Sequence, residues 1–219
     1  MTEWWSYRPS DFLMFSPRVY FRQVESYNAS LWPLHVAMVL VGVTLACLVL
    51  RGRPNDRRMV AMTLAALWLF VGWGYIWSRL SSINWAASYA AFGFGAQAIL
   101  TVSVYIRPTG EELHLIRKLP GIIVAAASIL AYPLLFLFSG RGHGVSEVFG
   151  IMPDPTVVTT IGLLAASRQR YDLVLFFIPC LWCVVSSVTL YTMRDITWWA
   201  PLAFAFSGLA AAAAGRLKT

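Results

Sequence analysis

The sequence predicts an all-α fold, a polytopic membrane helix bundle of about seven transmembrane segments, and two observations lead to this prediction. Of the 219 residues, 58% are hydrophobic and only 12% are charged, whereas soluble domains are closer to half apolar and a quarter charged. The apolar residues also gather into runs of about 20, the length that a helix needs to cross about 30 Å of hydrocarbon. Water is therefore not the solvent for most of this surface.

The first 30 residues predict a segment that lies in the membrane interface. They mix aromatic residues with three arginines and three acids, which makes them too polar for the apolar region of a secretory signal. Ser10-Asp11 and Ser16-Pro17 are helix-start signals. We expect one or two amphipathic turns in residues 1–30, followed by a single transmembrane helix-bundle domain over residues 31–219.

Six apolar runs are long enough to cross a membrane as helices. Between them lie short loops that carry most of the positive charge, so the net charge of +7 is an orientation signal and does not indicate nucleic-acid binding. The runs cover residues 31–50, 58–78, 86–106, 120–139, 172–191 and 197–215.

Whether a seventh crossing exists depends on residues 145–167. Residues 156–166 alone make a helix of about 16 Å, half a bilayer, whereas the whole segment reaches about 33 Å if it is helical. "PDPT" reads as a helix start, with Asp154 as N-cap and Pro155 at the first helical position. We therefore expect a fifth segment broken at Pro153–Pro155 into two half-helices. Transporters place their binding sites at such breaks.

The distribution of Lys and Arg favours the seventh crossing. If residues 145–167 cross, eleven of the 17 basic residues lie on one side and six on the other; otherwise the division is eight and nine. The positive-inside rule prefers the first arrangement. It predicts a multi-pass protein of the bacterial inner (plasma) membrane, with the N-terminus outside and the C-terminus cytoplasmic.

Two acids are candidates for membrane depth, because the other eight fall in tails, in loops or at helix ends. An ionised carboxylate costs at least about 2.5–3.5 kcal/mol at the bilayer centre, so Glu147 and Asp154 would be paired, protonated or functional. His143 precedes Glu147 by one helical turn. One hypothesis is a proton or cation site made of these three residues. In the alternative, Asp154 caps a helix while Glu147 and His143 occupy an outside loop.

Cysteine and histidine supply weaker candidates. "PCLWC" places Cys180 and Cys183 one turn apart, and Cys47 could be the third ligand of a soft metal. The alternative is that these thiols are small, polarisable core residues. His35, near the start of the first helix, could relay protons or bind an ion, or make an interhelical hydrogen bond.

Small residues spaced by four predict close helix packing. Ala91 and Gly95 form one such pair, and Ser207, Ala211 and Gly215 follow the same spacing in the Ala-rich last helix. That helix is a docking face within the bundle, in a homo-oligomer or against a partner membrane subunit. The sequence has no phosphate-binding glycine loop, nucleophile elbow or paired-histidine motif. We therefore expect no enzyme activity and see no cofactor motif.

Three stretches resemble a known family: "WWSYRPSDFLMFSPRVYFR", "INWAASYAAFGFGAQ" and "EVFGIMPDPTVVTTIGLL". They are similar to hallmark segments of an uncharacterised family of bacterial multi-pass membrane proteins, a domain of unknown function whose members are sometimes labelled permeases. The resemblance covers nearly the whole chain. It implies a bacterial inner membrane and one compact bundle, and it carries no active site over to this chain.

Three functions follow as hypotheses. The first is transport of a small solute or cation, possibly proton-coupled, through the carboxyl site at the broken helix. The second is an accessory or structural subunit of a larger membrane complex. The third is a thiol-based membrane metal or redox protein that uses Cys180 and Cys183.

Overall fold

The computed structural model describes residues 15–105, 114–167 and 172–216, and every regular element in those ranges is helical. The Ser10-Asp11 helix start lies outside them. Short 3₁₀ turns occupy Leu80–Ser82, Tyr132–Leu134 and His143–Val145. The longer elements are α1 (Pro17–Ser30), α2 (Leu34–Arg51), α3 (Pro54–Val71) with its π-helical extension (Gly72–Trp77), α4 (Ala87–Tyr105), α5 (Leu115–Leu130), α6 (Phe136–Ser139), α7 (Pro153–Ala165), α8 (Asp172–Thr192) and α9 (Ala200–Arg216).

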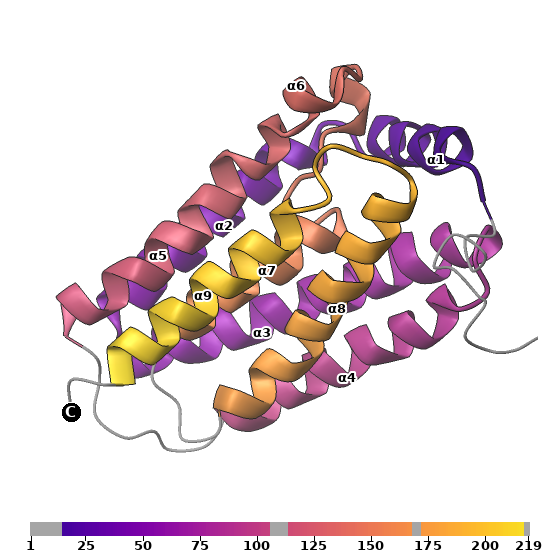
Figure 1. Cartoon of the computed structure of the whole chain (residues 1–219). Coiled ribbons are helices and arrows are strands. Elements are labelled where there is room, and N and C mark those ends of the chain that lie inside the picture. Colours follow the sequence, from indigo (N-terminus) through magenta and orange to yellow (C-terminus); the bar gives the residue numbers. More distant parts are fainter. Residues whose placement is uncertain (1–14, 106–113, 168–171, 217–219) are drawn as a thin grey trace, which may run out of the picture.

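Five helical stretches are long and apolar enough to cross a membrane, and α9 contains a shorter apolar one, Ala200–Ala214. The all-α class is thus confirmed for the described residues, whereas the number of crossings stays a prediction. Figure 1 shows the long helices side by side, with α1 and α6 at one end of the bundle, called here the α1 end. The five stretches are Leu34–Arg51, Pro54–Ser82, Ala87–Val104, Leu115–Ser139 and Leu173–Thr192.

The start of α1 agrees with the sequence prediction. The Ser16 hydroxyl accepts a hydrogen bond from the Val19 N–H at 3.3 Å, and Pro17 occupies the first helical position, where its missing N–H is no loss. The helix packs on the turn at His143–Val145. The Gln23 amide also donates to the Arg79 carbonyl at 2.7 Å, which fixes α1 to the segment that follows the π-helical extension of α3.

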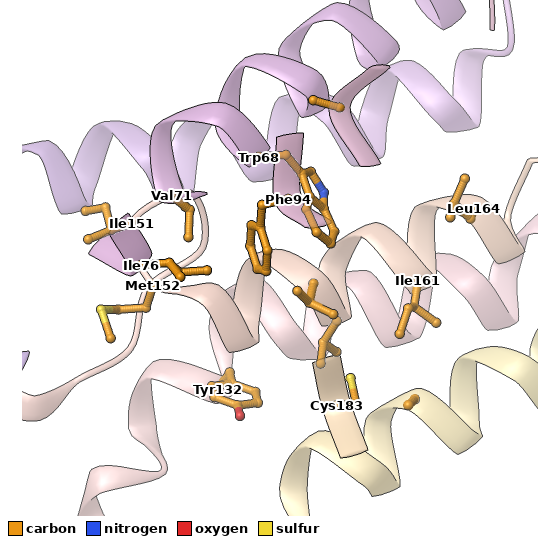
Figure 2. Packing of buried hydrophobic residues seen from close by; sticks show 14 of the residues in the cluster. Trp68, Val71, Ile76, Phe94, Tyr132, Ile151, Met152, Ile161, Leu164 and Cys183 are labelled. Atoms are coloured by element: carbon orange, nitrogen blue, oxygen red, sulfur yellow. The ribbon is translucent and has the colours of Figure 1, made fainter. Parts of the chain in front are cut away.

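Helix α7 is the centre of the fold. All 13 of its residues are buried, and it packs against α2, α3, α5, α8 and α9. In Figure 2, Trp68 and Phe94 lie on one side of α7, while Tyr132 and Cys183 lie on the other. The Trp68 indole N–H donates to the buried Thr160 hydroxyl at 3.0 Å, so this polar pair of the core is hydrogen-bonded as well as packed.

The first predicted half-helix is wrong. Residues 140–152 are irregular apart from one 3₁₀ turn, and only the second half-helix, α7, is formed. Gly150 lies within the predicted half-helix, and Gly140, Gly142 and Gly144 directly precede it; each disfavours a helix by about 1 kcal/mol relative to alanine. One of them, Gly150, has a φ of +76°, and a Cβ there would lie 2.8 Å from the Met38 sulfur. This turn directs the chain into α7.

Helices α5 and α7 run antiparallel and touch through two glycines. A Cβ on Gly121 would lie 2.5 Å from the Ala166 nitrogen, and one on Gly162 would lie 2.5 Å from the Ala125 nitrogen. The small-residue prediction therefore named a different pair. A Cβ on Gly95 meets no atom within 4 Å among the described residues, and Ser207 is exposed. Ala91 and Gly95 on α4 have the predicted spacing of four, but the close backbone contact lies between α5 and α7. Helix α7 makes this contact because it is buried among several other helices.

Candidate carboxyl site at the start of α7

Asp154 is buried in the first turn of α7, with 5% of its surface exposed. Three neutral groups donate hydrogen bonds to its carboxyl group: the Trp182 indole N–H to Oδ1 at 2.7 Å, the Ser186 hydroxyl to Oδ2 at 2.5 Å and the Tyr132 hydroxyl to Oδ2 at 3.2 Å. Neither Lys nor Arg forms an ion pair with it among the described residues. Its surroundings stabilise a carboxylate through hydrogen bonds and the positive end of the α7 dipole.

The N-cap prediction for Asp154 is wrong by two positions. Met152 is the N-cap residue, Pro153 begins the helix, and Pro155 is its third residue. The Asp154 side chain is consequently free to leave its own helix and accept bonds from α5 and α8. Its neighbour Thr156 supplies the local bond instead, since its hydroxyl accepts from the Gly150 N–H at 2.8 Å.

The three donors come from two neighbouring segments. Trp182 and Ser186 are four residues apart on α8, so they share one face of that helix. Tyr132 lies in the 3₁₀ turn that follows α5, next to Pro133, and its hydroxyl group is visible in Figure 2. The carboxyl group of Asp154 therefore joins α5, α7 and α8 at one point.

Glu147 lies in the irregular segment before α7. The residue is half-buried, but its Oε2 atom is sealed from solvent and has no hydrogen-bond partner among the described residues. Asp154, Asp195 and Arg141 are close enough to interact with it electrostatically. An unpaired ionised oxygen in such a place costs several kcal/mol, so a proton or a cation belongs with this carboxyl group.

An ion pair covers this region at the α1 end. The Arg141 guanidinium bonds to the Asp195 carboxylate, and it also lies 3.4 Å from the centre of the Phe21 ring. Burial alone raises the pKa of Asp195, but hydrogen bonds from the Thr197 hydroxyl and backbone N–H, and then Arg141, leave that pKa below its ordinary value. Asp195 is therefore ionised at neutral pH and holds Arg141 in place.

Two small pockets reach the carboxyl pair. A pocket of about 30 Å³ lies beneath the Arg141–Asp195 pair and is lined by Glu147 and Tyr132, among others. It has room for about two waters. A second pocket, of about 100 Å³, is lined by Trp182 and Ser186, the donors from α8. Tyr132 lines the first pocket and its hydroxyl donates to Asp154, so this residue links that pocket to the buried carboxyl.

The two histidines lie apart from the carboxyl pair. His143 and His35 both line a larger pocket on the other side of the irregular segment. The prediction that His143 and Glu147 share one face is wrong: the two residues line different pockets, because the chain between them leaves the helical path at Ser146 and the one-turn spacing of an α-helix does not apply.

The three cysteines lie at different depths. Cys47 on α2 is exposed, Cys180 on α8 is half-buried, and Cys183 is buried in the core. No group of three or more His, Cys, Asp or Glu side chains is arranged to hold a metal ion in the ranges that the structure describes.

The residues that the sequence did not single out are Tyr132, Trp182, Ser186, Arg141 and Asp195. Trp182 lies inside the "PCLWC" motif, but the prediction used only the two cysteines of that motif. Its spacing of four from Ser186 was the available signal, since it places two donors on one face of an apolar helix.

Comparison with known proteins gives a family and no function. The model of a family of unknown function (DUF6064) matches residues 17–211, most of the chain. The chain belongs to this family. The resemblance to an uncharacterised family is thereby confirmed. No curated protein and no solved structure matches the chain.

Proposed function

We propose that this member of the DUF6064 family is a bacterial inner-membrane protein with seven crossings. Five helices are long and apolar enough to span, and α9 is a sixth apolar helix. The segment 140–165 starts at the α1 end and runs antiparallel to α5, so it supports the remaining crossing, half irregular and half helical. The excess of basic residues at the opposite end supports a cytoplasmic C-terminus and an outside α1 end.

We infer that the protein transports a small solute or cation in exchange for protons, and that Glu147 and Asp154 carry the charge. One observation carries this inference. Among the described residues, a carboxyl oxygen of Glu147 is sealed from solvent and unpartnered, and it interacts electrostatically with a second buried carboxyl that has three donors and no Lys or Arg in an ion pair with it. Intramembrane acids in such surroundings mark ion and proton pathways.

The two carboxyl groups have different roles in the proposed exchange. Asp154 is supplied with donors and is suited to remain ionised, whereas Oε2 of Glu147 has no donor among the described residues, so this group is suited to hold the exchangeable proton or cation. Loss of that proton places a second negative charge beside Asp154. This repulsion favours uptake of a substrate cation, which is how one pair of acids couples two ions.

Both small pockets that reach the carboxyl pair lie toward the α1 end, while the opposite half of α7 is packed against α5 through Gly121 and Gly162. Release on the cytoplasmic side therefore requires α7 to move against α5.

Proteoliposomes test this function. With a pH-sensitive dye trapped inside, outward gradients of Na⁺, K⁺ and small organic ammonium ions are imposed in turn, and we expect at least one to drive protons inward. Asp154→Asn and Glu147→Gln should abolish the response, while Asp172→Asn, at the first position of α8, should retain it. Proton movement equal to that in protein-free vesicles for every gradient would overturn the proposal, as would full activity in both variants.

A second candidate, an accessory subunit, is favoured by one surface. A groove of about 350 Å³ on α3, its π-helical extension and α4 is lined by Trp73, Trp77 and Phe92, and the first and last of these are more than two-thirds exposed. Purification in mild detergent discriminates the two functions. A subunit should bring a stoichiometric partner protein, and Trp73→Ala with Phe92→Ala should release it without affecting the carboxyl pair.

A further inference from the structure

A larger pocket lies on the other face of the irregular segment, separate from the carboxyl pair. It has a volume of about 370 Å³ and lies between α1, the beginning of α2 and the turn at His143–Val145. This volume is within the range of small-molecule sites. Its polar and aromatic lining comprises Glu25, Asn28, Trp32, His35 and His143.

The lining is acidic and aromatic. Glu25 is the charged residue of the wall, and no Lys or Arg is among the described residues that line it. The side chain of Glu25 rests against Gly144, where an added Cβ would lie 3.2 Å from its Cγ. Trp32 is 69% exposed, lines the same pocket and has a tilted ring contact with His35, whose ring centre lies 6.1 Å away. A carboxylate and an indole that line one pocket are the groups that recognise an ammonium group.

Hydrogen bonding fixes the state of His35. The Asn28 amide nitrogen donates to the carbonyls of Gly144 and Ser146, both at 2.8 Å, so its oxygen is the acceptor that faces His35. His35 Nε2, 3.3 Å from that oxygen, is therefore the protonated nitrogen. Nδ1 is sealed from solvent and has no partner among the described residues, so a proton there would be a buried, unpaired donor and the neutral ring is favoured. His35 therefore adds no positive charge to the wall.

We propose that this pocket binds a small organic cation with an ammonium group and an apolar body. The ammonium group lies between the Glu25 carboxylate and the Trp32 ring, and the apolar part packs on Ala29 and Val148. A partly enclosed acidic pocket at the outside end of the bundle favours this class over an anion, which Glu25 repels.

The pocket is also joined to the carboxyl site by one segment of chain. Ser146 and Val148 line the larger pocket, whereas Glu147, between them, lines the 30 Å³ pocket with Tyr132. The extended residues 146–148 thus form the wall between the two. In this respect the inference rests on the proposed transport function: the organic cation would be the substrate, received here before the carboxyl pair. Binding itself does not depend on transport.

Binding to the purified full chain in detergent tests the proposal. The probe is radiolabelled 2-phenylethylammonium at neutral pH, with 3-phenylpropionate and phenylethanol as competitors of similar size. We expect saturable binding of the labelled probe. The anion and the alcohol should each displace it at least fivefold less well than unlabelled probe does. Glu25→Gln and Trp32→Ala should each weaken binding about fivefold, the factor expected from a partly exposed charge or cation–π contact.

Matched variants separate the proposal from general effects. Trp85→Ala removes a similarly exposed indole, at 60%, outside the pocket, and Glu25→Asp keeps the charge, so both should bind the probe nearly as wild type does. Equal competition by the alcohol, or unchanged binding in Glu25→Gln, would overturn the proposal. Asp154→Asn should leave binding intact even though it abolishes transport, so failure of the pocket and failure of the carboxyl pair are distinguishable.

Discussion

The two ends of α7 meet the same neighbour, α5, in opposite ways. At the end far from α1 the backbones touch through Gly121 and Gly162, with no space for even one Cβ on either glycine. At the α1 end the contact is polar: the Tyr132 hydroxyl of the turn after α5 donates to Asp154, and a pocket with room for water lies beside it.

The two ends of this buried helix differ in the changes they tolerate. Close backbone packing at the end far from α1 leaves no room for a larger side chain. The end near α1 is held by hydrogen bonds to a carboxyl group, which are directional and can be exchanged. A change at the first end should therefore act on folding, and a change at the second should act on ion exchange.

The largest effect is expected for Gly162→Leu. A side chain there must separate α5 from α7, so we expect a loss of about 3 kcal/mol or failure to accumulate in the membrane. Gly93→Leu is the matched control, because a Cβ on Gly93 meets no atom within 4 Å among the described residues. Thermal unfolding in detergent, followed by circular dichroism, measures both. Equal stability of the two variants would remove the distinction between the two ends of α7.

The next effect is expected for Asp195→Asn, which leaves Arg141 without its partner. We expect about 2 kcal/mol of destabilisation at pH 7. Because the pKa of Asp195 is lowered in the folded protein, the stability that its carboxylate provides is present above the ordinary value near 3.9. That stability is lost as the pH falls through the lower folded value. Unfolding temperatures of the two proteins should therefore converge below about pH 4, and a constant difference would argue against the ion pair.

Tyr132→Phe should have a smaller effect on stability. It removes one hydroxyl that donates to Asp154 at 3.2 Å while two other donors remain, so we expect a cost of about 1 kcal/mol. Proton exchange should slow much more than stability falls, because the link between the 30 Å³ pocket and Asp154 is lost. Dye-loaded proteoliposomes report the exchange rate, and an unchanged rate would show that protons reach Asp154 by another route.

The smallest effect is expected for Gly95→Ala on α4. Its position is open among the described residues, so a methyl group should change stability by less than about 0.5 kcal/mol and favour the helix slightly. A marked loss of stability in membranes but not in detergent would reveal a second protein packed on this face.

The sequence predicted most of the bundle and part of the site. Long apolar runs and the Ser16-Pro17 start are local signals, and the helices follow them within a few residues. Asp154 was predicted as a site residue because, unlike most of the other acids, it does not fall in an evident tail, loop or helix end. Its donors were not, because Tyr132 and Trp182 meet it only through tertiary packing of α5 and α8 against α7. The absent half-helix shows the same limit, since length alone favoured a helix from residue 145, where Gly150 and the three glycines just before the segment disfavour one.

The central claim is that Glu147 is the protonated member of an interior pair of acids. Infrared difference spectroscopy of the purified protein at neutral pH tests it directly, because a protonated carboxyl group absorbs apart from carboxylates. We expect one protonated carboxyl band that disappears in Glu147→Gln and shifts, but persists, in Asp154→Asn. A spectrum without such a band, or a band that both variants leave untouched, would contradict the account.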